Sequence, residues 1–471
     1  MDIRHDAGTP GFSDLLPVYN WFYPLASDQQ NEPDDPLTVF DRLPRSTGRT
    51  LALYLHIPFC SSICSFCTFL KKKSCQVGEI EDYVEALIRE ISLKASFPSV
   101  NDVPVRAIFF GGGTPSILSP EQILRIGRVI KTHFDLSQMI EFSFEMSPLH
   151  VEPAKLDAMQ SIGVTHARFG VQTFSPFYRR VFHLTSTPEQ IGEAASLLPT
   201  YFNRVSFDML YGMHGQNDEE FFGDLDGAVS LGLDNMAFYP INNAAVQPSL
   251  HEAILAAGRQ PTTGVTKFYM NVIIKRFMHC HGYLPHNGHE YVRVSQREID
   301  KAPVVTDTYS FVYHEHVYGY ANQEVLGFGA NAVSRVNEYV VNNVDSIDRY
   351  VKGLLHGRTP IMTVKHHSRA TDEGRGIILR LPYHGRIQKK MVVWEHIDAE
   401  VLHALEELIS AGFVRDTKNT LELTEHGWRW YVNLMYYLSP PEEKRIIDAF
   451  VAQRRGDANR ILEDCRVTHV L

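Results

Sequence analysis

Short apolar segments alternate with amphipathic segments along the first 280 residues. Apolar runs of strand length occur at 51–57, 105–110, 139–146, 166–172, 203–211 and 235–241. Hydrophobic residues repeat with helical spacing at 78–96, 119–134, 152–162, 187–200, 217–231 and 264–281. This alternation predicts a parallel sheet covered by crossover helices. Six strand–helix pairs favour an α/β fold built on a partial (β/α)6 barrel of the TIM type over an open sheet.

Helix-capping residues sharpen several of these boundaries. Ser119-Pro120 and Thr187-Pro188 place an N-cap directly before a proline at the first helical position. Gly163 and Gly232 stand where helix C-caps belong.

The alternation ends near residue 282, which suggests a division into four parts. Residues 1–48 are rich in Asp and Pro, and we interpret them as an N-terminal extension or as a flap over a site. The barrel would span 49–290, and a connecting region rich in Tyr, His and Gly would span 291–395. Residues 396–471 combine helical patterns with a short strand, which predicts a small C-terminal domain of winged-helix type.

Composition narrows the class of protein. The 471 residues include 44% hydrophobic and 21% charged residues, as in ordinary globular proteins. A net charge of −10 argues against a nucleic-acid-binding surface. We see neither a secretory signal nor an apolar run of membrane-spanning length, so the sequence predicts a cytoplasmic protein that binds no membrane. Six cysteines, three of them within eight positions, do not resemble a disulfide framework.

Polar and glycine residues gather where the predicted strands end. In parallel α/β folds these carboxyl ends meet at one edge, where the functional site lies. The residues that follow or end the six strands are the cysteine loop Cys60–Cys67, the glycine turn Gly111–Gly113, Glu145, Gln172, Asp208 and Asn242.

The cysteine loop carries the strongest chemical signal. Cys60, Cys64 and Cys67 are spaced C-x3-C-x2-C, which suits three corners of a cubane iron–sulfur cluster and leaves one iron open. A zinc site closed by Cys75, or reduced buried thiols, are the alternatives. Zinc ligands are more often spaced as two separated pairs.

The glycine turn and Glu145 suggest a ligand opposite the cysteine loop. Backbone N–H groups in Gly111–Gly113 can approach a carboxylate because no side chain blocks them. A tight turn is the alternative. Glu145 ends a buried strand, where it needs either a ligand or a structural ion pair. Gln172 and Asp208 allow the same argument less strongly.

These motifs together resemble the radical S-adenosylmethionine (SAM) enzymes, and within them the oxygen-independent coproporphyrinogen III oxidase (HemN-like) group. The resemblance extends over about residues 50–440, and the following segments carry it: 54–60, the Cys60–Cys67 loop with Phe66, 111–115, 170–174, 207–212 and 325–334.

The resemblance implies a [4Fe–4S] cluster on Cys60, Cys64 and Cys67, with SAM on the open iron. Reductive cleavage of SAM by an electron donor such as flavodoxin or ferredoxin would yield a 5′-deoxyadenosyl radical that abstracts hydrogen from a small-molecule substrate. The residues matching a first SAM site are Tyr54, Gly112, Glu145, Asn242 and Val333. Those matching a second SAM site are Phe66, Gly113, Thr114, Gln172 and Asp208.

One departure bears on the reaction. The group carries an Arg about twelve residues after the Gln172 position, where this chain has Leu184. Either Arg179 or Arg180 replaces the missing cation, or the second SAM pocket has another function.

Our leading hypothesis is therefore alkylation of an organic metabolite: methyl or methylene transfer, or cyclopropanation, of the class C radical SAM type. The alternatives are a tetrapyrrole enzyme (an oxidative decarboxylase of coproporphyrinogen or an anaerobic haem-ring opener) and a non-catalytic haem chaperone anchored by histidines within 279–316. A zinc-binding structural protein is the remaining one.

Overall fold

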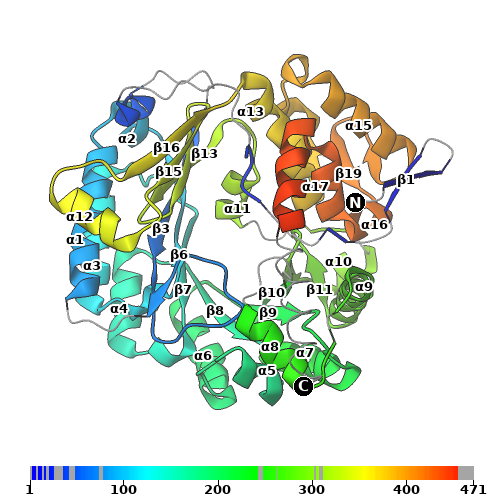
Figure 1. Cartoon of the computed structure of the whole chain (residues 1–471), viewed down its shortest axis with the longest axis horizontal. Coiled ribbons are helices and arrows are strands. Elements are labelled where there is room, and N and C mark those ends of the chain that lie inside the picture. The colour runs from blue at the N-terminus through cyan, green and yellow to red at the C-terminus, as the bar shows by residue number, and fades with distance from the viewer. Residues whose placement is uncertain are drawn as a thin grey trace, which may run out of the picture.

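One sheet of twelve strands runs through most of the protein. The computed structural model describes residues 3–6, 9–12, 15–16, 21–25, 35–41, 48–73, 78–241, 248–260, 262–301, 304–306 and 311–453. The strand order is β11-β12-β10-β9-β8-β7-β6-β3-β13-β14-β15-β16. Figure 1 shows the sheet in the middle of the molecule, with helices on its outer side.

The six predicted strands form the parallel centre of this sheet. They are β3 (Thr50–Ile57), β6 (Val105–Gly112), β7 (Glu141–Met146), β8 (His166–Gln172), β9 (Arg204–Tyr211) and β10 (Asn235–Pro240). Each is hydrogen-bonded in parallel to the next. Their side chains are largely buried, as expected where helices cover a parallel sheet. The predicted α/β partial barrel is confirmed.

The six predicted helices are also present. They are α1 (Glu79–Lys94), α3 (Pro120–His133), α4 (Pro153–Ile162), α6 (Pro188–Tyr201), α7 (Asp218–Ser230) and α9 (Gly264–Cys280). Ser119 and Thr187 are N-caps, as predicted, and each also forms a capping box, with Gln122 and Gln190 respectively. Gly163 caps α4 in the left-handed conformation, with a φ of 95°.

The sheet extends beyond these six strands on both sides, which the hydrophobic pattern did not predict. β13 (Gln323–Phe328) pairs in parallel with β3, so the strand that leads into the cysteine loop lies between two parallel neighbours. β14 (Val333–Val336), β15 (Tyr339–Asn343) and β16 (Ile361–His366) continue from β13 in antiparallel fashion. At the other edge, β12 (Glu290–Arg293) and β11 (Tyr283–Pro285) follow β10.

A buried ion pair on α1 ties this extension to the barrel. Glu90 and Lys94 lie one helical turn apart at 2.6 Å, and both side chains are fully buried. Lys94 also donates to the Gly327 carbonyl at 2.7 Å. The Glu90 carboxylate accepts from the Gly329 N–H at 2.7 Å and from the Asn343 amide at 2.7 Å. Buried charges are tolerated when such hydrogen bonds satisfy them.

A smaller C-terminal unit packs beside the sheet (Figure 1). It contains a three-stranded sheet in the order β17-β19-β18 and the helices α15 (Ala399–Ser410) and α17 (Tyr431–Leu438). This agrees with the predicted winged-helix-like domain, although β17 (Arg386–Gln388) precedes residue 396. Phe12, from the N-terminal part, packs against Phe413 with ring centroids 5.4 Å apart. The boundaries of the four predicted parts stay predictions.

The remaining elements are mostly short. They are β1 (Ile3–Asp6), β2 (Thr9–Phe12), β4 (Phe59–Cys60), β5 (Lys72–Lys73), α2 (Pro98–Asn101), α5 (Pro176–Val181), α8 (Pro248–Ala256), α10 (Gln296–Lys301), α11 (Val312–Val317), α12 (Ile347–Leu355), α13 (Arg369–Arg375), α14 (Leu381–His384), β18 (Val414–Asp416), β19 (Thr420–Leu423) and α16 (Glu425–Arg429).

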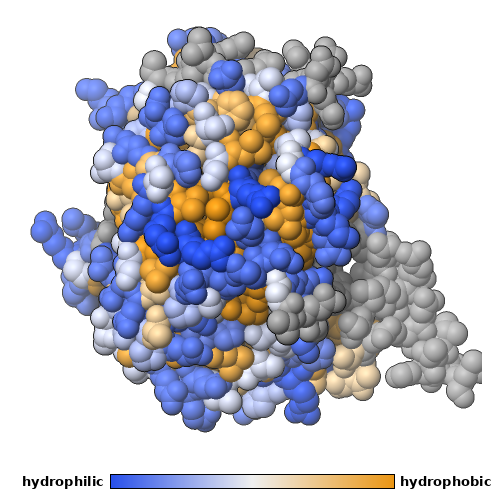
Figure 2. Space-filling model, turned by 90° about the vertical axis from the view of Figure 1, so that its left-hand side faces the viewer, coloured by the Kyte–Doolittle hydropathy of each residue, from blue (hydrophilic) through white to orange (hydrophobic). Residues whose placement is uncertain are grey.

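The outer surface is mixed in polarity. Figure 2 shows the side of the molecule that carries α1, α3 and α12, where hydrophilic residues cover much of the face and hydrophobic residues show between them. Within the described part of the chain, no helix has both the length and the apolar character needed to cross a bilayer.

We expect Lys94→Met to lower the free energy of unfolding by about 3–5 kcal/mol, because it leaves the Glu90 carboxylate buried without its charged partner. Urea denaturation measures this. The control is Arg89→Ala on the same helix, whose partner Glu85 is about as exposed as Arg89 itself, and which should cost at most about 1 kcal/mol. Equal effects of the two substitutions would contradict the prediction.

Candidate functional site

The cysteine loop is held at both ends by the surrounding backbone. β3 ends at Ile57, and β4 and β5 then pair across the loop through Phe59 with Lys72 and Cys60 with Lys73. On the other side, Ser65 donates from its backbone to the Phe182 carbonyl at 3.2 Å and from its hydroxyl to the Val181 carbonyl at 2.8 Å. The loop is therefore a fixed part of the barrel rim.

The three predicted cluster ligands line one cavity as free thiols. Cys60 is buried, and Cys64 and Cys67 are partly buried. Burial, with the neighbouring thiols, raises the pKa of Cys64 to about 12. Lys71 lines the same cavity, and its charge opposes the rise in the pKa of all three thiols.

The glycine turn lies directly against the cysteine loop. The Gly113 N–H donates to the Ile57 carbonyl and the Thr114 N–H to the Phe59 carbonyl, each at 2.8 Å. A Cβ on Gly113 would come within 2.7 Å of the Phe59 carbonyl oxygen and 2.8 Å of the Pro58 carbonyl carbon. Gly112 has a φ of 111°, which favours glycine. Glycine is thus needed here for close packing of two backbones.

Glu145 and Asp208, the two carboxylates predicted for the site, lie on the same cavity as a buried arginine, Arg168, which was not predicted. Arg168 donates to Asp208 at 3.0 Å and to Glu290 on β12. Burial raises the pKa of Glu145 to about 7; Asp208 adds to the rise, whereas Arg168 opposes it. Arg168, Gly170 and Gln172 alternate along β8, so this period-two pattern was the signal for Arg168.

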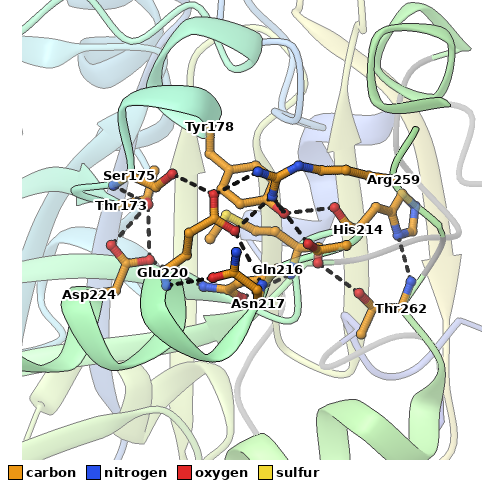
Figure 3. Close-up of polar contacts among 12 residues, drawn as sticks. Thr173, Ser175, Tyr178, His214, Gln216, Asn217, Glu220, Asp224, Arg259 and Thr262 are labelled. Carbon is orange, nitrogen blue, oxygen red and sulfur yellow. Dashed lines mark hydrogen bonds and ion pairs between the residues drawn. The ribbon is translucent and has the colours of Figure 1, made fainter. Parts of the chain in front are cut away.

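Gln172 ends β8 in a left-handed conformation, with a φ of 71°. A polar network behind it, drawn in Figure 3, holds the loop that follows. Buried Asp224 on α7 accepts from the Thr173 hydroxyl at 2.9 Å and from the Phe174 N–H at 2.6 Å. Burial raises the pKa of Asp224 to about 7.

The same network reaches a second, charged pair. Glu220 is ion-paired with Arg259 at 2.7 Å and accepts from the Ser175 hydroxyl at 3.0 Å. Arg259 also donates to the Tyr178 hydroxyl at 2.8 Å (Figure 3). These residues were not predicted, because they act through the loop and not on a ligand.

Two adjoining cavities collect most of the predicted site residues. The smaller, of about 230 Å³, is lined by Cys60, Cys64, Phe66, Cys67, Gly112, Gly113, Thr114, Glu145, Gln172 and Asp208. The larger, of about 450 Å³, is lined by Tyr54, Phe66, Cys67, Gly112, Glu145, Gln172 and Asp208. Val333 lies on β14 and is not among the described residues that line either cavity. Asn242 lies outside the described residues.

Leu184 lines the smaller cavity, and neither suggested arginine replaces it. Arg179 is buried, and its guanidinium donates to the carbonyls of Val171, Thr173 and Ser186. Arg180 is exposed and is not among the described residues that line this cavity. The proposed substitution of one cation by another is therefore wrong for Arg179.

The larger cavity also receives residues from outside the barrel, including the N-terminal part that we interpreted as an extension or a flap. Trp21 and Phe22 reach it from the N-terminal part, and Tyr318 and Tyr383 from beyond the barrel. Leu25 anchors the N-terminal segment by donating from its N–H to the Glu443 carboxylate at 2.9 Å.

Comparison with known proteins identifies the domain that carries this site. Residues 54–226 match the family model of the radical SAM superfamily. They form a radical SAM domain. The superfamily uses a [4Fe–4S] cluster and SAM, as the sequence analysis expected.

Several relatives of the HemN-like group match most of the chain. Anaerobilin synthase of Escherichia coli O157:H7 is 25% identical over 395 residues, covering 84% of this chain and 85% of the relative. The oxygen-independent coproporphyrinogen III oxidase of Pseudomonas aeruginosa is 24% identical over 399 residues, covering 81% and 84%. The heme chaperone HemW of Bacillus subtilis is 24% identical over 388 residues, covering 79% and 95%.

A solved structure supports the fold. Coproporphyrinogen III oxidase (HemN) from Escherichia coli superposes with a TM-score of 0.70 at 22% identity, covering 85% of this chain and 92% of that one.

The donor set at this cavity fits an iron–sulfur cluster. Such clusters are held by cysteine thiolates. Cys60, Cys64 and Cys67 are free thiols that line one cavity.

We expect Gly113→Ala to lose the iron–sulfur cluster while the protein stays folded, because the added methyl group displaces the cysteine loop. Iron content after anaerobic reconstitution measures the loss, and circular dichroism checks the fold. Gly192→Ala in α6 is the control, since its Cβ meets no atom within 4 Å. Full iron occupancy in the Gly113 variant would contradict this account of the turn.

Proposed function

We propose that this protein is a radical SAM enzyme that abstracts a hydrogen atom from an organic substrate bound in the larger cavity. The observation that carries the proposal is that Cys60, Cys64 and Cys67 border the same cavity as Gly112, Glu145 and the other strand-end residues. Cys67, Gly112 and Glu145 also line the larger cavity, so the cluster loop and the substrate space adjoin.

In this proposal Cys60, Cys64 and Cys67 hold the cluster, and Tyr54, Gly112 and Glu145 bind the SAM that completes it. When bound, the cluster supplies the electron that cleaves SAM and so provides a carbon radical. The walls of the larger cavity are largely aromatic, and walls that keep water from a bound substrate would protect such a reactive species from side reactions. The Tyr54 hydroxyl is bonded to His56 Nδ1 at 2.9 Å, which fixes its orientation in the wall. A flavodoxin or ferredoxin remains our prediction for the electron donor.

Anaerobic reconstitution tests the proposal. We expect about four irons per chain and formation of 5′-deoxyadenosine from SAM under reducing conditions. Cys64→Ala should abolish both, since it removes one of the three thiolates. Cys280→Ala, at an exposed cysteine on α9, is the control and should leave both unchanged. A Cys64 variant that still cleaves SAM would refute the assignment.

Alkylation with a second SAM is our candidate for the finer reaction. Two adjoining cavities support it, since the smaller one offers Thr114 and Gln172 in addition to the larger substrate space. The smaller cavity has Leu184 where the coproporphyrinogen oxidase group carries an Arg, so it lacks the cation expected of that group. The tetrapyrrole reactions of the named relatives are the alternative.

Product analysis separates these reactions. We expect alkylation to give S-adenosylhomocysteine together with 5′-deoxyadenosine, because one SAM donates a methyl group and the other is cleaved. Incubation with coproporphyrinogen and with haem tests the tetrapyrrole alternative. Turnover of either, with 5′-deoxyadenosine as the sole SAM-derived nucleoside, would favour decarboxylation or ring opening over alkylation.

Three of the histidines within 279–316 are held by protein partners, which gives little support to them as haem anchors. His316 is bonded through both ring nitrogens, to Thr50 and to the Val312 carbonyl. His286 is bonded to Glu290 at 2.9 Å, and His289 to the Tyr431 hydroxyl at 3.1 Å. To bind iron through Nε2, His316 and His286 would each have to give up the bond that this atom makes.

A further inference from the structure

The walls of the larger cavity are built mainly of aromatic rings from distant parts of the chain. They include Trp21, Phe109, Tyr239, Phe311, Tyr313 and Tyr383. Phe109 and Tyr313 are stacked with centroids 4.5 Å apart, and Tyr54 stacks on Tyr313 at 5.9 Å. Rings fixed in this way offer flat faces to a ligand, and aromatic pairs prefer offset stacking or edge contact.

The charges in these walls are unfavourable for an anionic ligand. Among the described lining residues the charged side chains are Glu145, Arg168 and Asp208. The guanidinium of Arg168 already serves Asp208 and Glu290, and it lies over the Phe311 ring at 4.7 Å. A substrate carboxylate would therefore have to compete with two protein carboxylates for one cation.

Other basic residues near the cavity do not supply the missing charge. His314 lines the cavity, but burial lowers its pKa to about 3, so the ring is neutral and its Nδ1 is bonded to the Tyr383 hydroxyl at 3.1 Å. Lys71 lines the smaller cavity, and its ammonium donates to the Cys67 carbonyl at 2.5 Å. Arg179 is committed to backbone carbonyls.

We propose that the larger cavity binds an uncharged, flat, unsaturated substrate and rejects polycarboxylates such as coproporphyrinogen. This inference rests on the proposed function, because it assigns a substrate class to the same site. Stacking and apolar burial would provide the affinity. Asp208 and Glu290, which already hold Arg168, the cation in the wall, would provide the rejection. Such repulsion is a common source of specificity, since like charges placed together are costly.

A pair of probes with one ring system tests the charge rule. We would measure binding of 1-naphthamide and 1-naphthoate to the anaerobically reconstituted protein at pH 7.5, by equilibrium dialysis with SAM present and no reductant. The amide should bind at least about tenfold more tightly than the carboxylate. Equal affinity, tighter binding of the carboxylate, or no binding of either probe at millimolar concentration would overturn the inference.

A substitution that adds a cation to the cavity wall should shift the binding preference toward the carboxylate probe. Val317, at the end of α11, lines the larger cavity outside the predicted SAM residues. Val317→Arg should raise the affinity for naphthoate relative to naphthamide at least about fivefold, because it supplies a cation that no carboxylate yet holds. Val317→Leu is the matched control and should keep the preference for the amide. An unchanged preference in a folded Val317→Arg protein would contradict the electrostatic argument.

The proposed function and the proposed substrate class can be refuted by different results. Loss of SAM cleavage in the native protein would refute the proposed function, whatever the probes do. Normal SAM cleavage with a preference for naphthoate would refute only the substrate class.

Discussion

The close contact between two stretches of backbone governs the geometry of the site. The cysteine loop and the glycine turn touch through main-chain atoms, with Gly113 and Thr114 donating to carbonyls of Ile57 and Phe59. A hydrogen bond between backbones cannot adjust as a side chain can, so the loop is fixed relative to β6. In the proposed site the three thiols depend on this fixed position, because the irons of a cluster lie at fixed distances from one another. The rest of the rim, including Glu145 and Gln172, is arranged around the same cavity.

Around that contact the protein uses buried polar groups to hold its loops. Asp224 holds the segment after Gln172, and Arg168 joins β8 to β9 and β12. Each of these groups would be costly to bury alone, and each is paired. Because Arg168 is paired with carboxylates of the protein, the walls of the larger cavity offer a ligand mainly aromatic surface. The same ion pairs thus hold the loops of the site and determine which ligand the cavity favours.

The sequence predicted those features that local pattern determines. Strand and helix periodicity located the six barrel strands and six helices, and capping residues such as Ser119 marked where helices begin. The cysteine spacing and the glycine turn identified the rim. Pairing across long distances left no local signal, so β13, Glu290 and the aromatic residues of α11 were missed. Nearness in sequence also misled: Arg179 lies close to Leu184 along the chain, yet it turns toward backbone carbonyls.

The position of β13 has a consequence for the order in which the protein is made. β3, which leads into the cysteine loop, is bordered on one side by β6 and on the other by β13. Arg49, next to β3, contacts Glu324 on β13, and these two residues are 275 positions apart in sequence. During synthesis on the ribosome that second border is missing until most of the chain has emerged. Contacts of such long range form late and slowly. The nascent barrel therefore has an open strand edge beside the cysteine loop until β13 has been synthesised.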